Sequence, residues 1–69
     1  MFIVQDLTHS YRHITNDVET AADIVLGITG DDRDYQYVNF VAGRMTFGDI
    51  FMSHGSGGTY SVQCVKEVD

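Results

Sequence analysis

Apolar and β-prone residues gather in runs near the two ends of the chain. Phe2 to Leu7 and Tyr11 to Thr15 are rich in β-branched and aromatic residues, and the short polar segment Thr8 to Ser10 separates them. Two such runs joined by a short polar turn predict a β-hairpin at the start of the chain.

A second hairpin is predicted near the other end. Phe47 to Asp49 has the composition of a turn, and the runs Ile50 to Ser53 and Thr59 to Val68 lie on either side of the glycine-rich loop His54 to Gly58. Glycine-rich connections between β-prone runs favour hairpins. Alternation in the last strand sorts its side chains into an inward set, Tyr60, Val62 and Cys64, and an outward set, Ser61 and Gln63.

Between the hairpins the hydrophobic period changes to that of an α-helix. Asn16 is suited to cap the first helix, and Glu19 three residues later is typical of a capping box. Gly30 is suited to end it. The apolar face is predicted to consist of Val18, Ala21, Ala22, Ile24, Val25 and Ile28, and the opposite face of Glu19, Thr20, Asp23 and Gly27.

The segment Asp34 to Ala42 has the composition of a strand but the pattern of a helix. As a strand, each of its faces would contain a polar residue. As a helix capped by Asp31 or Asp32, it separates two sides. The apolar side holds Val38, Val41, Ala42 and Met45, flanked by Tyr35 and Tyr37, and the polar side holds Gln36, Asn39 and Gly43.

Residues 1–69 are therefore predicted to form one α+β domain with the order β-β-α-α-β-β. Its helices should cover one face of an antiparallel sheet, since each element has a single apolar side to bury. If residues 34–42 form a strand instead, the fold becomes one helix on a four- or five-stranded meander.

Charge limits what the chain can bind. It carries ten acidic and four basic residues, and six of the ten acids lie between Asp17 and Asp34. Affinity for nucleic acid comes from Lys and Arg neutralising phosphates. We therefore expect no direct binding to DNA or RNA. Hydrophobic residues make up 43% of the chain, which is typical of a folded domain rather than a disordered acidic tail.

The single cysteine and the start of the chain bear on its location. Cys64 cannot form an internal disulfide, which favours a reducing compartment for so small a domain. The start, Met1 to Asp6, lacks the basic region of a signal peptide and is too short in apolar residues for a membrane span. These features predict a soluble cytoplasmic protein with no membrane partner.

No residue pattern predicts catalysis, a metal or a cofactor. His9 and His13 have the spacing of helical metal ligands, but they fall in a predicted turn and strand. Cys64 is expected to face inward as a small apolar residue rather than act as a nucleophile. The loop Gly55 to Thr59 lacks both the Lys and the following helix of a phosphate-binding loop, although it could fold against a partner. We expect the protein not to be an enzyme.

The acidic segment is the candidate binding site. Glu19 and Asp23, one helical turn apart, place carboxylates about 6 Å apart along the helix axis, which is similar to the spacing of phosphates on a nucleic-acid strand. Asp31, Asp32 and Asp34 follow at the junction between the helices. Such a row can occupy a basic groove built for phosphate. Tyr35 and Tyr37 are candidate aromatic anchors beside it. The alternative is that these charges only keep the surface solvated.

In class the chain resembles the small acidic inhibitor proteins that phages encode, including the anti-CRISPR proteins. The resemblance lies in its size, negative charge, single cysteine, lack of a catalytic motif and the acidic stretch Asp17 to Asp34. It implies a protein that binds a CRISPR effector or another basic nucleic-acid enzyme and blocks its nucleic-acid groove. It transfers no functional residue. The alternative is an interaction module, such as a phage or bacterial accessory subunit, that docks by its sheet edge or Gly-rich loop.

Overall fold

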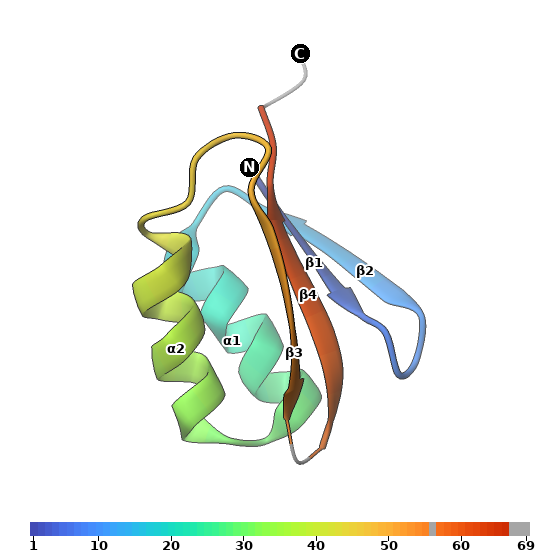
Figure 1. Cartoon of the computed structure of the whole chain (residues 1–69). Helices are drawn as coiled ribbons and strands as arrows, with labels where there is room; N and C mark the ends of the chain where they lie inside the picture. Colours follow the sequence, from blue (N-terminus) through green and yellow to red (C-terminus); the bar gives the residue numbers. More distant parts are fainter. Residues whose placement is uncertain (56, 67–69) are drawn as a thin grey trace.

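Two helices lie on one face of a four-stranded antiparallel sheet in the computed structural model, which describes residues 1–55 and 57–66 (Figure 1). The elements are β1 (Phe2–Asp6), β2 (Tyr11–Thr15), α1 (Val18–Thr29), α2 (Asp32–Ala42), β3 (Ile50–Gly55) and β4 (Gly58–Cys64). The predicted order β-β-α-α-β-β is confirmed. The alternative with a strand at residues 34–42 is wrong, because this segment lies within α2.

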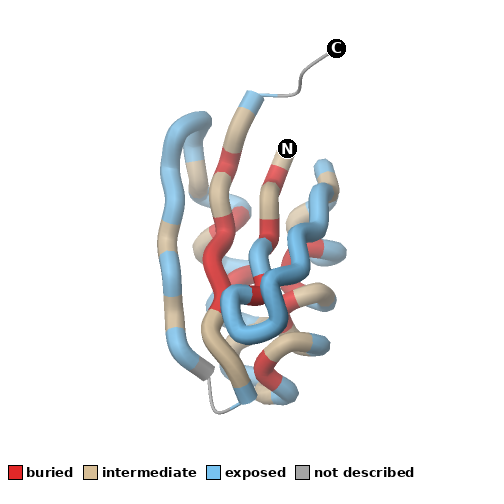
Figure 2. The backbone as a smooth tube through the Cα atoms, turned by 90° about the vertical axis from the view of Figure 1, so that its right-hand side faces the viewer, coloured by how far each residue is buried: buried red, intermediate tan, exposed pale blue. Residues whose placement is uncertain are grey.

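The sheet has the strand order β2-β1-β4-β3, so the first and last strands of the chain pair in its centre. In this central pair Val4 lies opposite Val62, and each strand also carries its own hairpin partner on the outside. Figure 2 shows the buried positions concentrated along the central strands and the inner sides of the helices, whereas β2 is exposed over most of its length.

The core lies between the helices and the central strands. The predicted inward set of β4 is confirmed, since Tyr60, Val62 and Cys64 are all buried. From the other elements, the buried hydrophobic residues are Phe2, Val4, Ala21, Ala22, Val25, Val38 and Ala42. The opposite face of the sheet is not covered by any described element, so this domain buries one side of its sheet only.

Helix α1 is capped by Asp17 and not, as predicted, by Asn16. The Asp17 carboxylate accepts hydrogen bonds from the Thr20 backbone N–H at 2.9 Å and the Thr20 hydroxyl at 2.7 Å. The helix thus begins one residue later than expected, and Thr20, not Glu19, occupies the third helical position that a capping box requires. The predicted end is confirmed: Gly30 has a left-handed φ of 73°, and its N–H donates to the Leu26 carbonyl.

Helix α2 is capped by Asp31, one of the two predicted candidates. Its carboxylate accepts from the Arg33 backbone N–H at 2.9 Å. Val38 and Ala42 are buried on the inner side of the helix. The polar side is also confirmed, because Gln36, Asn39 and Gly43 are exposed.

Ser61 lies on the outward face of β4, as predicted, but it is buried there. It lies on the central strand β4, with Gln5 of β1 and Met52 of β3 directly opposite it in register. A small side chain between two longer ones is shielded by them, and Ser61 is only 4% exposed. Strand β4 also ends earlier than predicted, at Cys64, and residues 67–68 of the predicted strand lie outside the described residues.

The glycine-rich connection is shorter than predicted, because β3 extends to Gly55 and β4 begins at Gly58. A Cβ atom on Gly57 would lie 2.5 Å from the carbonyl oxygen of Thr29 at the end of α1. Glycine here permits the tip of the hairpin to pack directly against the helix. This part of the loop is therefore occupied by an internal contact.

Candidate functional site

Glu19 and Asp23 lie on the solvent side of α1, as predicted. Both are exposed, and their i, i+4 spacing puts them on the same side of the helix. Within residues 1–55 and 57–66, the one Lys or Arg side chain within ion-pair distance of a carboxylate is Arg33, which binds Asp31. The charges of Glu19 and Asp23 are therefore not neutralised by a neighbouring cation in this part of the chain.

Tyr35 of α2 lies beside these two carboxylates. Its ring packs partly against the core, and burial raises the pKa of its hydroxyl. The negative charges of Glu19 and Asp23 raise this pKa further, as does a hydrogen bond between the hydroxyl and Glu19. The structure thus brings together three of the predicted site residues on the outer surface of the helix layer.

The acids at the start of α2 differ in their environment. Asp31 is bound by its neighbour: the Arg33 guanidinium donates to the Asp31 carboxylate at 2.8 Å, and hydrogen bonds from Arg33 lower the pKa of this group. Asp32 is exposed and Asp34 is half-buried. Of the three predicted site residues at this junction, Asp31 is already neutralised, and Asp32 and Asp34 lie in the first turn of the helix, where negative charge is favoured.

Tyr37 is separated from Glu19 and Asp23, whereas Asp34 lies about one turn before it on α2. Its ring contacts Phe51 of β3 edge-on, with a centroid distance of 5.7 Å, and Phe51 contacts the buried Tyr60 in the same manner. Tyr37 is nevertheless 51% exposed. It therefore lies on the β3 side of α2, whereas Tyr35 lies on the α1 side, and the two predicted aromatic anchors do not form one site.

Arg12 and Arg44 form no ion pair with Glu19 or Asp23. Arg12 is on the exposed strand β2, in register with Gln5 on the open face of the sheet. Arg44 follows α2, where its guanidinium lies 3.7 Å above the Phe40 ring and donates to the Phe40 carbonyl. The acidic residues of α1 and of the first turn of α2 thus lie on the helix side of the sheet. Arg12 lies on the other side of the sheet.

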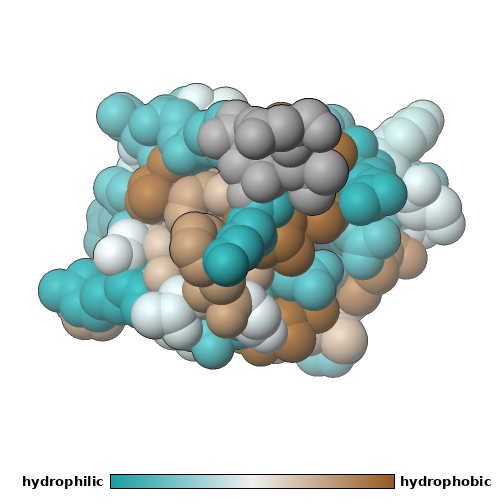
Figure 3. Space-filling model, turned by 90° about the horizontal axis from the view of Figure 1, so that it is seen from above, coloured by the Kyte–Doolittle hydropathy of each residue, from teal (hydrophilic) through white to brown (hydrophobic). Residues whose placement is uncertain are grey.

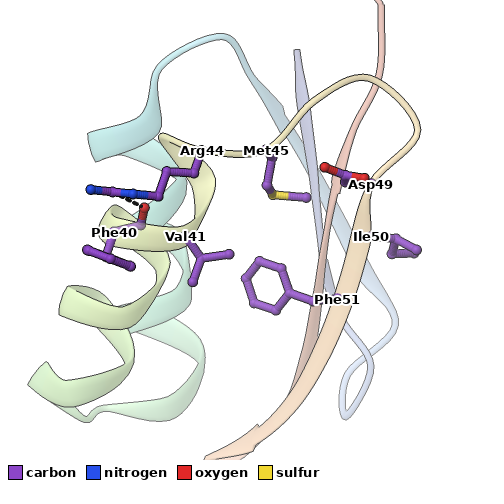
Figure 4. A pocket seen from close by; sticks show the side chains of 7 residues that line it. All are labelled: Phe40, Val41, Arg44, Met45, Asp49, Ile50 and Phe51. Carbon is purple, nitrogen blue, oxygen red and sulfur yellow. Dashed lines mark hydrogen bonds between the residues drawn. The ribbon is translucent and has the colours of Figure 1, made fainter.

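A groove between α2 and β3 was not predicted. It has a volume of about 310 Å³, and its lining is mostly apolar: Phe40, Val41, Arg44, Met45, Asp49, Ile50 and Phe51. In Figure 4 the Phe51 ring points from β3 toward α2, whereas Ile50 points to the other side of the strand. The available signal was Phe40, an apolar residue beside Gln36 on the polar side of α2. Its ring is 59% exposed.

Apolar side chains reach the surface at further places. Figure 3, which views the molecule from above, shows hydrophobic residues at the surface among hydrophilic ones. Large hydrophobic residues with the greatest exposed fractions are Tyr11, Ile14, Tyr37, Phe40, Phe47, Ile50 and Met52. The open face and outer strands of the sheet account for Tyr11, Ile14, Ile50 and Met52.

The side chains with potential for metal or acid-base chemistry are dispersed. His9 Nδ1 lies 2.9 Å from the carboxylate of the buried Asp6, which also accepts from the Thr8 and His9 backbone N–H groups. Burial alone would raise the pKa of Asp6, but these hydrogen bonds outweigh it and the pKa is lowered. No group of three or more His, Cys, Asp or Glu side chains that could hold a metal occurs among the described residues. Cys64 is buried.

Comparisons with protein-family models, curated proteins and solved structures found no match to this chain. Neither helix in the described part of the chain is long and apolar enough to cross a membrane. The case for a function therefore depends on the surface itself.

Proposed function

We propose that this protein is a small acidic inhibitor that binds a basic, nucleic-acid-binding protein, such as a CRISPR effector, and occupies its nucleic-acid groove by negative-charge mimicry. The observation that carries this proposal is the pair Glu19 and Asp23, two exposed carboxylates on one side of α1 with no cation beside them within residues 1–55 and 57–66.

Geometry and charge support this function. The two carboxylates are separated by one turn, a rise of about 6 Å along the helix axis, which suits contacts made for successive phosphates. Tyr35 adds an aromatic ring beside them. Asp32, which is exposed in the first turn of α2, extends the negative potential to that end of the two helices. With a net charge of −6, the molecule is attracted to a basic groove from a distance, which speeds association.

The test compares two variants of equal net charge. Glu19→Gln with Asp23→Asn removes two negative charges from α1, and Gln5→Lys with Gln63→Lys adds two positive charges on the open sheet face. Each changes the net charge from −6 to −4. We expect the α1 variant to weaken inhibition of a purified CRISPR effector's DNA binding about tenfold or more, and the sheet variant to have a much smaller effect.

A salt series gives an independent readout. Inhibition by mimicry should fall steeply as ionic strength rises, because exposed charges are screened beyond about 8 Å at physiological salt. Equal losses in the two variants would show that net charge alone matters and would contradict a specific anionic site. Inhibition that is insensitive to salt would contradict mimicry altogether.

The second candidate is an interaction module that docks without mimicry. The specific observation in its favour is the apolar groove between α2 and β3, next to the edge of the sheet. A partner held there would bind mainly through apolar contacts and backbone hydrogen bonds, so its affinity should respond little to salt.

A further inference from the structure

The free edge of β3 carries unpaired backbone groups. The Cys64 N–H donates to the Asp49 carbonyl at 2.9 Å, so the backbone groups of Asp49 lie on the side of β4. This contact determines which residues of β3 direct their backbone groups toward β4. In an antiparallel pair these residues alternate with residues whose N–H and C=O groups point away. By this alternation, Ile50, Met52 and His54 direct their backbone groups to the outside of the sheet, at an edge that no other described strand occupies.

Between Ile50 and Gly55 this edge lacks the charged residues and proline that usually prevent strand pairing. A bulge lies just before it, where Gly48 and Asp49 both bond to Cys64. Soluble proteins protect an edge with charged residues, proline or a bulge. The opposite edge, β2, carries Arg12, whereas β3 has no Lys, Arg, Asp, Glu or Pro between Ile50 and Gly55. Ile50 and Met52 are also 60% and 64% exposed, so the unprotected edge is apolar as well.

We propose that β3 binds β3 of a second copy of this chain in antiparallel fashion, with the two-fold axis at Met52. In this register Met52 lies opposite its own counterpart, and Ile50 of each copy lies opposite His54 of the other. All these pairs belong to the set with outward backbone groups, so each N–H and C=O at the edge gains a partner. Paired residues keep their side chains on the same face, which gives one continuous sheet with all helices on one side.

Charge favours a second copy at this edge over other positions. Two molecules of net charge −6 repel one another, so they associate best through a surface without acids. The acids Glu19 and Asp23 lie on the helix layer, and β3 is uncharged. Asp49, directly before β3, lies opposite Gly55 of the other copy in this register, so the two Asp49 carboxylates do not face each other. On the helix side of the edge, the apolar groove lined by Phe40, Val41 and Phe51 adjoins the interface, and Phe51 lies opposite Ser53 of the other copy.

The exposed area is sufficient for a weak dimer. Fully exposed aromatic side chains present about 150 to 250 Å², so half-exposed Tyr37 and Phe40 offer on the order of 100 Å² each. With Ile50 and Met52, each copy contributes on the order of 400 Å² of apolar surface before the strand backbone is counted, which places the interface at the low end of specific complexes. Buried area does not convert directly to affinity, so the dissociation constant is obtained from a concentration series.

The first measurement is the mass of the purified protein by sedimentation equilibrium. We expect a rise from 7.7 kDa toward twice that value as the concentration increases from about 1 µM to about 1 mM. Salt should strengthen the dimer by screening the repulsion between copies, which is opposite to its effect on binding to a basic partner. A mass that stays monomeric throughout would overturn the proposal, and would leave the edge to a strand from another protein.

The matched variants are Met52→Lys and Ile14→Lys. Both residues are exposed on the open face of the sheet, but Ile14 lies on β2 at the opposite edge. Met52→Lys places two like charges opposite each other at the axis and should raise the dissociation constant more than tenfold, whereas Ile14→Lys should leave it unchanged. An equal loss in both variants would show that copies pair through the open face, and would overturn the β3 assignment.

Cross-linking supplies a second readout, because oxidation traps even a weak dimer covalently. Hydrogen-bonded antiparallel pairs have Cα atoms about 5.5 Å apart, which is within the range that a disulfide spans. Mild oxidation of Met52→Cys should therefore give a covalent dimer, and Ile14→Cys should give none under the same conditions. The native Cys64 is buried and does not compete. Failure of Met52→Cys to cross-link faster than Ile14→Cys would contradict the proposed register.

Discussion

At the scale of single residues, an added methyl group should change the stability of the protein in opposite directions at Gly57 and Gly27. A Cβ on Gly57 would meet the Thr29 carbonyl oxygen at 2.5 Å, whereas a Cβ on Gly27 has no atom within 4 Å. We expect Gly57→Ala to destabilise the protein by about 1 to 3 kcal/mol through overpacking. Gly27→Ala, on the exposed side of α1, should stabilise it by about 0.5 to 1 kcal/mol.

Urea denaturation of both variants, followed by circular dichroism, measures this difference. Gly27 serves as the internal control, because it makes the same chemical change without the steric contact. A Gly57→Ala protein as stable as the wild type would show that the hairpin tip does not pack against the end of α1.

Several residue-level features could be predicted from the sequence, and others could not. Gly30 ends α1 as expected, because its left-handed conformation is a local property that glycine favours. Ser61 takes the outward face that alternation predicted, but its burial could not be predicted, because alternation shows which face a side chain takes and not how far its neighbours extend. The heights of Gln5 and Met52 matter only once the register between strands is known.

At the scale of elements, the start of α1 depends on Asp17. Its carboxylate accepts two hydrogen bonds from Thr20. Both lower the pKa of Asp17 below its ordinary value of 3.8, and the bond from the Thr20 hydroxyl contributes more than the bond from the backbone N–H. Asp17→Ala removes both acceptors and should lower the urea midpoint. Asp17→Asn retains an oxygen acceptor and should restore most of the loss, since Asn caps helices about as well as Asp.

Chemical denaturation at neutral pH distinguishes these outcomes, and the helical circular-dichroism signal shows whether α1 itself is shortened. If Asp17→Ala were as stable as the wild type at pH 7, the Thr20 contacts would make no contribution to the folded state. A loss that Asp17→Asn does not restore would mean that the negative charge at the helix start matters more than the hydrogen bonds.

The helices were predictable because their patterns are periodic, but the position of α2 relative to α1 was not. The i, i+4 pair Glu19 and Asp23 follows from the sequence alone. That Tyr35 joins this pair while Tyr37 turns to Phe51 depends on which side of α2 each neighbour occupies. The same reason explains why the groove at Phe40 was missed: it forms where α2 and β3 leave a space between them.

At the scale of the whole molecule, stability should depend on pH at both extremes. Asp17, Asp31 and Asp49 have pKa values lowered below 3.8 by hydrogen bonds from Thr20, Arg33 and Thr46 respectively. A lowered folded-state pKa contributes stability above the unfolded value, and this is lost as pH falls through the folded value. Burial raises the pKa of Tyr35 and Tyr60 above 10.0, so their contribution is lost as pH rises beyond 10.0.

We therefore expect the free energy of unfolding to fall below pH 3.8 and again above pH 10.0, with a broad maximum between them. Thermal denaturation across this range measures the profile. Tyr60→Phe is the control for the alkaline limb, because it removes the ionisable group of the fully buried ring. A melting temperature that is constant between neutral pH and pH values well above 10.0 would contradict this assignment.

Molecular charge was predictable in amount but not in arrangement. The sequence contains the excess of acids, but only the fold shows that Asp31 is neutralised by Arg33 and that Arg12 lies on the side of the sheet opposite the helices. That the unpaired edge of β3 lies beside the apolar groove could not be predicted either, because it depends on the order of the strands in the sheet.

The pairing of β1 with β4 has a consequence for how the chain acquires its structure during synthesis. The centre of the sheet joins Phe2 to Cys64, so β1 gains its central partner only after all the other elements of this domain have left the ribosome. Contacts so distant in sequence form late and slow the search for the native state. Nascent chains stalled before residue 58 should remain sensitive to protease, and protection should arise in a single step once β4 has emerged.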